Sequence, residues 1–121
     1  MEREKWMEMY ETKKRINDLI TARDAGLDYD SDELKQLEEH REKLWGESMW
    51  EQMQMDPETN FCFKSRFYDG MTYRQIMLLV YGGMKCESHA RKRISRWFKK
   101  WEEEGIEYED YKRMKNEKEQ Q

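Results

Sequence analysis

The sequence predicts an all-α protein, because three of its features favour helices over strands. Apolar side chains recur at intervals of three, four or seven residues along much of the 121-residue chain, which is the spacing of one helix face. Ten Met and sixteen aromatic residues dominate the apolar supply, and such large side chains fill the irregular gaps between helices well. Capping residues, glycines and the single proline stand where the periodic segments begin and end.

The first predicted helix covers residues 3–24. Its apolar face consists of Trp6, Met9, Ile16, Leu19 and Ile20. Gly26 follows at the position where a helix commonly ends, because glycine adopts a positive φ without strain.

The second predicted helix starts at Asp30, whose side chain can cap it, with Glu33 at the capping-box position. Its apolar face runs through Leu34, Leu37, Leu44, Trp45, Met49 and Met53. The short connecting loop favours an antiparallel hairpin over residues 1–55. Such a hairpin suits dimerisation or contact with a partner, and an acidic surface that mimics DNA is a further alternative.

A third helix is predicted from Asp56-Pro57 to about Tyr68, with Asp as cap and Pro at the first helical position. Its candidates for the core are Phe61, Phe63 and Phe67. Gly70 ends it. Because Asp56 and Pro57 interrupt the apolar periodicity, they also mark the expected boundary between the hairpin and a second domain over 56–104.

Two more helices are predicted within that second domain, separated by Gly82-Gly83. The first begins at Thr72, with Gln75 completing a capping box, and its inward residues are Ile76, Leu79 and Val80, with Met77 beside them. The second runs from about Cys86 to Glu104. A helical projection gathers Glu87, Ala90, Ile94, Trp97, Phe98 and Trp101 on one side. The other side collects Lys85, Ser88, His89, Lys92, Arg96, Lys99 and Lys100. A short helix and a charged tail are expected over residues 105–121.

The net charge of −4 hides a strong asymmetry along the chain. Residues 1–60 hold nine Lys and Arg against seventeen Asp and Glu, a net charge of −8. Residues 61–100 hold ten against two, a net charge of +8, and residues 101–121 hold four against eight, a net charge of −4. The positive charge is therefore local, and local charge is what attracts a phosphate backbone.

The basic side of the 86–104 helix is the strongest functional signal in the sequence. A helix preceded by a shorter helix and a glycine turn predicts a helix-turn-helix unit, whose second helix enters the major groove of DNA. The candidates for base contacts are Ser88, His89, Lys92 and Arg96. The candidates for phosphate contacts are Arg74, Lys85, Arg91, Arg93, Lys99 and Lys100. A solvated basic face without a partner is the simpler alternative.

Other chemistry receives little support. Cys86 and His89 could share a metal on one helical turn, but two ligands do not make a site, and His89 on a groove-facing side with Cys86 as a small apolar residue is the preferred interpretation. There is no nucleophile motif, phosphate loop or dinucleotide fingerprint, so neither catalytic residues nor a cofactor are expected.

Trp97 and Trp101 share a face with Ile94 and are predicted to lie in the core rather than to stack on bases. No apolar run reaches the roughly 18 residues of a membrane span, and two cysteines give no disulfide framework. We therefore expect a cytoplasmic, nucleoid-associated protein.

Residues 61–101 resemble small phage-encoded transcription regulators of the RinA/ArpU type. The resemblance is carried by GMTYRQI, the glycine turn and RKRISRWFKK. In that family a helix-turn-helix similar to region four of bacterial sigma factors binds DNA. The resemblance implies supporting roles for Arg66, Phe67, Gly70, Thr72, Tyr73 and Ile76, and groove contacts for Arg91, Arg93, Ile94 and Arg96. Met77 and a turn longer than the usual three or four residues depart from the pattern.

Together these features predict a non-enzymatic, sequence-specific protein that binds double-stranded DNA, a phage or prophage transcription regulator that is a possible homodimer or partner of RNA polymerase. Two alternatives stay open: an inhibitor of a host defence nuclease that acts by binding protein, and a DNA-packaging adaptor similar to a terminase small subunit.

Overall fold

The structure, a computed structural model, describes residues 1–104, 113 and 117. This part of the chain is all-helical and contains no strand, which confirms the predicted fold class. Its elements are α1 (Arg3–Asp24), α2 (Ser31–Glu47), α3 (Met49–Gln54), α4 (Pro57–Phe63), the π-helical turn η1 (Lys64–Tyr68), α5 (Tyr73–Leu79) and α6 (Ser88–Glu104). The short helix predicted after Gly105 and the charged tail lie outside the described residues.

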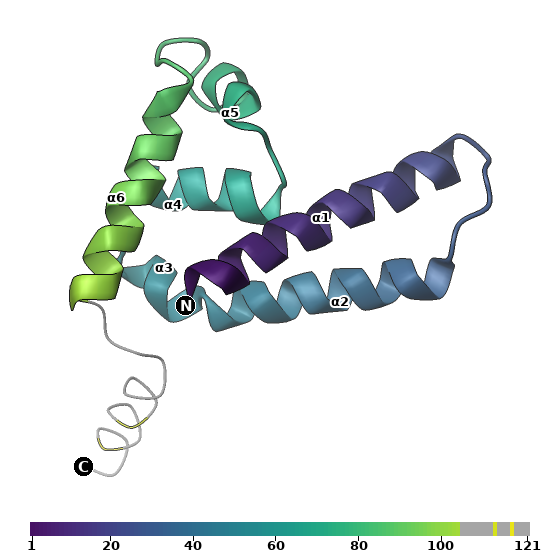
Figure 1. The fold of residues 1–121 in the computed structure, drawn as a ribbon, viewed down its shortest axis with the longest axis horizontal. Coiled ribbons are helices and arrows are strands. Elements are labelled where there is room, and N and C mark those ends of the chain that lie inside the picture. The colour runs from purple at the N-terminus through teal and green to yellow at the C-terminus, as the bar shows by residue number, and fades with distance from the viewer. Residues whose placement is uncertain (105–112, 114–116, 118–121) are drawn as a thin grey trace.

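Helices α1 and α2 lie side by side and run in opposite directions (Figure 1). The predicted caps are present: Asp30 accepts a hydrogen bond from the Glu33 amide at 3.0 Å, and Gly26 has a φ of 76°. The Glu33 side chain does not return to the cap. Its carboxylate instead accepts from Arg15 at 2.9 Å and ties the two helices together. A small core of Ile16, Leu19 and Leu34 closes the end of the pair that is nearest the loop.

The second helix is shorter than the sequence predicts, because the chain breaks at Ser48. The Ser48 hydroxyl donates to the carbonyl oxygen of Trp45 at 2.7 Å, and α3 starts afresh from the next residue. The break turns α3 so that Glu51 and Gln52 are buried while Met49 and Met53 face outward. The predicted apolar face is therefore wrong for these two methionines.

The main core joins both halves of the chain. It combines Trp6, Met9, Tyr10, Leu44, Met55, Cys62, Phe63, Phe67, Ile76, Ala90, Ile94, Trp97 and Phe98. The rings of Trp6 and Phe63 meet edge to face at 4.8 Å, and those of Phe63 and Phe98 do so at 5.3 Å. One helix ends and another begins around Asp56, where the domain boundary is predicted. The core nevertheless contains residues from both sides of this point, so it crosses the predicted boundary.

A buried carboxylate lies between the two halves. Glu51 on α3 is only 1% exposed. It accepts hydrogen bonds from the indole nitrogens of Trp6 at 3.3 Å and Trp97 at 2.7 Å, and the Met1 amino group lies 2.5 Å from it. A buried carboxylate is costly unless its oxygens are satisfied, and here donors from α1 and α6 satisfy them.

Three further residues predicted to be buried are exposed. Phe61 is 61% exposed, because it lies about 200° around the helix from Phe63 and both cannot face one core. Leu79 is 70% exposed and Val80 is exposed as well, since α5 ends where no other described element covers it. Ile76 alone among the predicted inward residues of α5 is fully buried.

Candidate nucleic-acid interface

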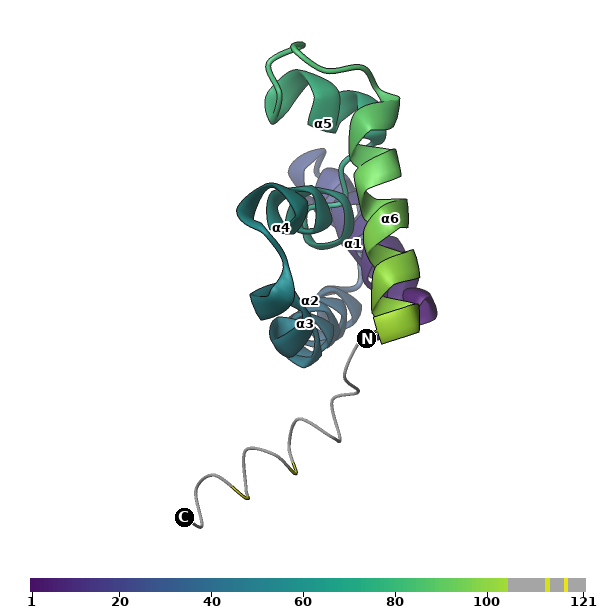
Figure 2. The same ribbon diagram turned by 90° about the vertical axis from the view of Figure 1, so that its left-hand side faces the viewer.

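Helix α6 presents one buried face and one open face. Ala90, Ile94, Trp97 and Phe98 are buried against the core, as the helical projection predicts, whereas Glu87, which the projection put on the same side, is exposed. Trp101 is half-buried and stacks on Trp97 at 5.9 Å between ring centroids. Figure 2 shows α4 and most of α1 on one side of α6, with the start of α1 emerging on the other side near the end of α6. The open face of α6 carries the exposed residues Arg91, Lys92, Arg96, Lys99 and Lys100.

Seven exposed cations occupy or border this open face, and we call them the basic face. They are Arg74, Lys85, Arg91, Lys92, Arg96, Lys99 and Lys100. Within the described residues none of them forms an ion pair. Lys100 lies 5.7 Å from the Trp97 ring, which leaves its ammonium group at the surface.

Several cations elsewhere in the described residues are paired with acids. Arg3 lies 2.5 Å from Glu102, and Lys5 lies 3.2 Å from Glu47. Exposed pairs of this kind contribute little to stability, but they cancel local charge. Lys13, Lys14, Lys35 and Lys43 also form no ion pair within the described residues, but they lie on α1 and α2 among acidic residues. The basic face differs in that seven such cations gather on and around one helix.

Two predicted DNA-contacting residues are turned toward the protein instead. Arg93 places Nη2 2.6 Å from Asp56 and donates through Nε to the Thr59 hydroxyl at 3.0 Å. His89 Nε2 lies 3.1 Å from Glu58, and its ring meets the Tyr81 ring edge to face. The helical projection placed His89 on the basic side, but the acidic start of α4 draws both side chains to the edge of the core.

These contacts shift the pKa values of the groups involved. Hydrogen bonds from Thr59 and Arg93 hold the pKa of Asp56 well below its usual range. Hydrogen bonds from His89 and Tyr81 lower the pKa of Glu58. Burial, together with the contacts to Cys62 and Glu58, raises the pKa of Tyr81 far above its ordinary value. The cluster is thus an ionised anchor that fixes how the first turns of α6 lie on α4.

The helix that precedes α6 begins as the sequence predicts. Thr72 and Gln75 form a reciprocal capping box at 3.1 and 2.8 Å. The chain then turns at Gly82 and Gly83, which have φ angles of 57° and 78° that favour glycine. Figure 2 shows α5 running across the view and α6 running down it, with this turn between them.

The start of α6 borders a hollow of about 350 Å³ that is lined by Tyr73, Cys86, Glu87, Ser88 and Arg91. Cys86 is exposed, not packed as a small apolar residue, and its Sγ lies 3.3 Å from the Ser88 hydroxyl. This hydrogen bond lowers the pKa of the Cys86 thiol. Ser88 is therefore oriented by its neighbour at the edge of the basic face.

Comparison of the chain with protein-family models, with curated proteins and with solved structures gives no match. The function must therefore be argued from the residues themselves.

Sequence reasoning missed the partners that hold α6 in place. It assigned Asp56 the role of a helix cap, whereas Asp56 and Glu58 both bind side chains of α6. The sequence signal for this role was the presence of two carboxylates at a helix start. Besides capping their own helix, such carboxylates can accept hydrogen bonds from a neighbouring basic helix. It also missed Glu51, the buried acid of a tryptophan-rich segment.

The described part of the chain contains no group of three or more His, Cys, Asp or Glu side chains placed to hold a metal ion. None of its helices combines the length and the apolar character that crossing a bilayer requires.

Proposed function

We propose that this protein binds double-stranded DNA sequence-specifically by docking the open face of α6 in the major groove. The observation that carries the proposal is the basic face: seven exposed cations with no acid partner among the described residues, on and around a helix whose opposite face is anchored in the core. DNA rewards such a cluster because neutralised phosphates release counterions. A helix is the element that fits the major groove.

The position of each cation indicates whether it contacts bases, which gives sequence readout, or phosphates, which position the protein on the DNA. Lys92 and Arg96 lie on the open face of α6, where they reach base edges. Arg74 and Lys85 lie on α5 and the turn, and Arg91, Lys99 and Lys100 lie along or at the end of α6, so these five contact phosphates. His89 and Arg93 hold α6 on α4 in this proposal and do not contact DNA.

The biological role we propose is transcription regulation in a phage or prophage, in keeping with the resemblance of residues 61–101 to RinA/ArpU-type regulators. The α5–turn–α6 segment is then the helix-turn-helix, and the α1–α2 pair contacts a second copy or RNA polymerase.

The deciding experiment selects bound sequences from a random duplex pool with the full chain at two salt concentrations. A recurrent motif, enriched at both concentrations, is the expected result. A palindromic motif would establish a dimer as well, since half-site symmetry mirrors protein symmetry. A pool without enrichment, together with binding that does not respond to salt, would overturn the proposal.

The exposed end of α5 favours one further role, contact with protein. Leu78, Leu79 and Met84 are exposed, and Met84 is 85% exposed. An inhibitor or packaging adaptor would use such a patch. Binding of a defence nuclease in the absence of any affinity for duplex DNA would favour the first, and a ring-sized mass in solution would favour the second.

A further inference from the structure

One acidic residue lies within the basic part of the chain. Residues 70–100 hold eight Lys and Arg and a single acid, Glu87. Glu87 comes directly before the first residue of α6, at the end of that helix that lies nearest the glycine turn (Figure 2). It is exposed. Its carboxylate forms no ion pair or hydrogen bond with any described residue, although Arg91 follows only one helical turn later.

The two polar side chains that follow Glu87 are already bound within the protein. The Ser88 hydroxyl lies 3.3 Å from Cys86 Sγ, and His89 Nε2 lies 3.1 Å from Glu58. The first turn of a groove-binding helix is the part that normally meets base edges. Glu87 is therefore the polar residue at this end of α6 whose side chain stays available to a base.

Glu87 also borders open space. It lines the hollow of about 350 Å³ at the start of α6, together with Tyr73, Cys86, Ser88 and Arg91. Residues four apart lie on the same side of a helix, and Arg91 belongs to the basic face. The hollow thus brings an anion and a cation, which form no ion pair with each other, to the side of α6 that docks on DNA in our proposal.

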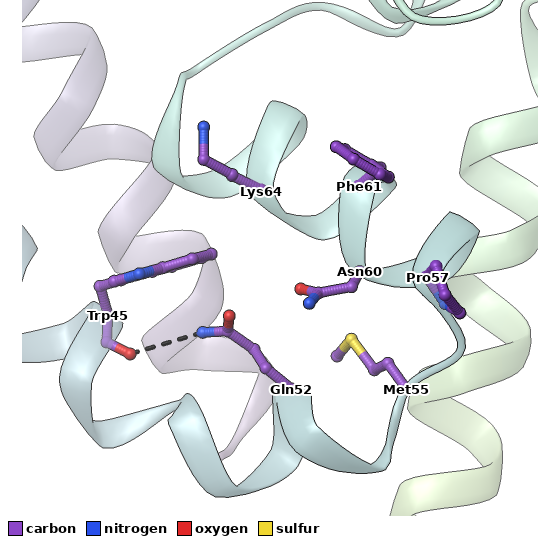
Figure 3. A pocket seen from close by; sticks show the side chains of 7 residues that line it. All are labelled: Trp45, Gln52, Met55, Pro57, Asn60, Phe61 and Lys64. Carbon is purple, nitrogen blue, oxygen red and sulfur yellow. Dashed lines mark hydrogen bonds between the residues drawn. The ribbon is translucent and has the colours of Figure 1, made fainter.

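A hollow between α3 and α4 lacks such a group (Figure 3). It has a volume of about 290 Å³ and is lined by Trp45, Gln52, Met55, Pro57, Asn60, Phe61 and Lys64. Lys64 is the one charged residue of this lining, and its ammonium group is bound to Asp69 at 3.1 Å. An unpaired charge beside open space therefore distinguishes the start of α6 from this hollow.

An acid on a surface that docks on DNA has an electrostatic cost unless it accepts a hydrogen bond. Phosphates repel a carboxylate, since like charges that face each other oppose binding. Guanine O6 and N7 and thymine O4 are acceptors, so they cannot donate to it. Cytosine presents its N4 amino group as a donor in the major groove, and a carboxylate is the usual partner of this group. Adenine presents an acceptor, N7, beside its N6 donor, so it suits a carboxylate less well than cytosine.

We propose that Glu87 is a specificity-determining residue that accepts a hydrogen bond from the N4 amino group of a cytosine in the major groove. This inference rests on the proposed docking of α6 in DNA. Glu87 then rejects guanine and thymine at that position, because their acceptors face its carboxylate without a donor. Lys92 and Arg96 are donors that suit guanine, so Glu87 adds a base position of the opposite polarity to the DNA site.

The test repeats the selection from a random duplex pool with the full-length wild type, Glu87→Ala and Glu87→Gln. The wild type should select a motif with one cytosine that Glu87→Ala no longer prefers. Glu87→Gln should prefer adenine there, because a glutamine amide pairs with adenine N6 and N7. Glu103→Gln removes an exposed acid near the other end of α6. It is the matched control and should keep the cytosine.

Binding titrations then separate base readout from charge. Exchange of that C·G pair for a T·A pair should weaken wild-type binding about tenfold and leave Glu87→Ala binding almost unchanged. For a duplex without the motif, Glu87→Ala should bind more tightly than the wild type, because a carboxylate that phosphates repel has been removed. The same substitution thus acts in opposite directions on specific and nonspecific binding.

The outcomes distinguish this inference from the proposed function. A wild-type motif that both Glu87 variants retain unchanged would overturn the role of Glu87 and leave DNA binding intact. A less stable Glu87→Gln variant with an unchanged base preference would do the same, and would assign Glu87 to stabilising the positive end of the α6 dipole. A wild type that selects no motif would overturn both.

Discussion

Arg93 on α6 and Asp56 at the start of α4 are joined by a hydrogen bond of 2.6 Å between Nη2 and Oδ2. The pair belongs to an arrangement in which Thr59, Glu58 and His89 also take part. The pair uses the Arg93 guanidinium to orient a helix, whereas Arg91, Lys92 and Arg96 form no ion pair with any described residue. Basic residues that lie next to each other in the sequence therefore have different roles, since one orients α6 and its neighbours stay available on the basic face.

This division of tasks predicts different effects for two neighbouring arginines. Arg96→Ala should weaken specific DNA binding by about 1–3 kcal/mol and relax the base preference at one position, with the stability of the fold unchanged. Arg93→Ala should lower the free energy of unfolding by about 1 kcal/mol, because Asp56 and Thr59 lose their donor. Denaturant unfolding and binding isotherms measured on both variants check this. Loss of stability in Arg96→Ala, or an unchanged stability in Arg93→Ala, would contradict it.

A phosphate contact should change the salt dependence of binding without changing the sequence preference. Lys99→Ala is expected to weaken binding to specific and nonspecific duplexes alike, and to reduce the slope of log affinity against log salt by about 1. Lys5→Ala is the matched control, because Lys5 is paired with Glu47 away from the basic face. Titrations at several salt concentrations give both slopes. Equal slopes for the wild type and Lys99→Ala would remove Lys99 from the interface.

Three glycines offer a graded test of backbone strain. Gly70 has a φ of 69°, and a Cβ there would lie 2.8 Å from Lys13 Cγ. Gly82 has a φ of 57° with open space around it, and Gly46 in α2 has neither restriction. Alanine should therefore cost more than about 1–2 kcal/mol at Gly70, about that amount at Gly82, and stabilise by about 0.5–1 kcal/mol at Gly46. Urea unfolding measures the series, and any other order would contradict the strain argument.

The anchor at the start of α4 should make stability depend on pH in acid. Asp56 and Glu58 have pKa values below their ordinary 3.8 and 4.5 in the folded protein. They therefore stabilise the fold fully above pH of about 4.5, and this contribution is lost as the pH falls through the lower folded values. Asp56→Asn keeps the helix cap and should show a smaller loss of unfolding free energy between pH 5 and pH 3 than the wild type. Identical pH profiles would show that Asp56 does not contribute.

The two thiols should react at very different rates. Cys86 is exposed and its pKa is lowered by the hydrogen bond with Ser88, whereas Cys62 is buried and burial raises its pKa. A thiol-specific dye should label Cys86 rapidly at neutral pH and Cys62 only after unfolding. Because Cys86 lies beside the basic face, the dye should also weaken DNA binding. Cys86→Ser removes both effects in the control, and rapid labelling of that variant would contradict the assignment.

Much of the fold follows from local signals in the sequence. The capping residues Asp30, Asp56 and Thr72 and the turn residues Gly26 and Gly70 act where they stand, so their effect depends on few other residues. The core face of α6 was predictable for the same reason, since its apolar side chains keep one period over the whole helix.

The errors concern positions whose outcome depends on distant partners. No sequence signal near Ser48 predicts that a break there would bury Glu51, because the indoles that satisfy this acid come from α1 and α6. Likewise the periodicity of α5 marks Leu79 as inward, but only the tertiary arrangement shows that no helix covers it. The helical projection placed His89 on the basic side, but Glu58 of α4 draws it to the edge of the core.

Glu51 has a consequence for how the molecule unfolds. Its two indole donors belong to helices that are 91 residues apart in the chain, at Trp6 and Trp97. If either helix detached alone, the buried carboxylate would lose one of its donors. Detaching one helix before the other therefore has a high free-energy cost. The acidic and the basic halves are therefore expected to melt in a single cooperative transition, despite their contrasting composition.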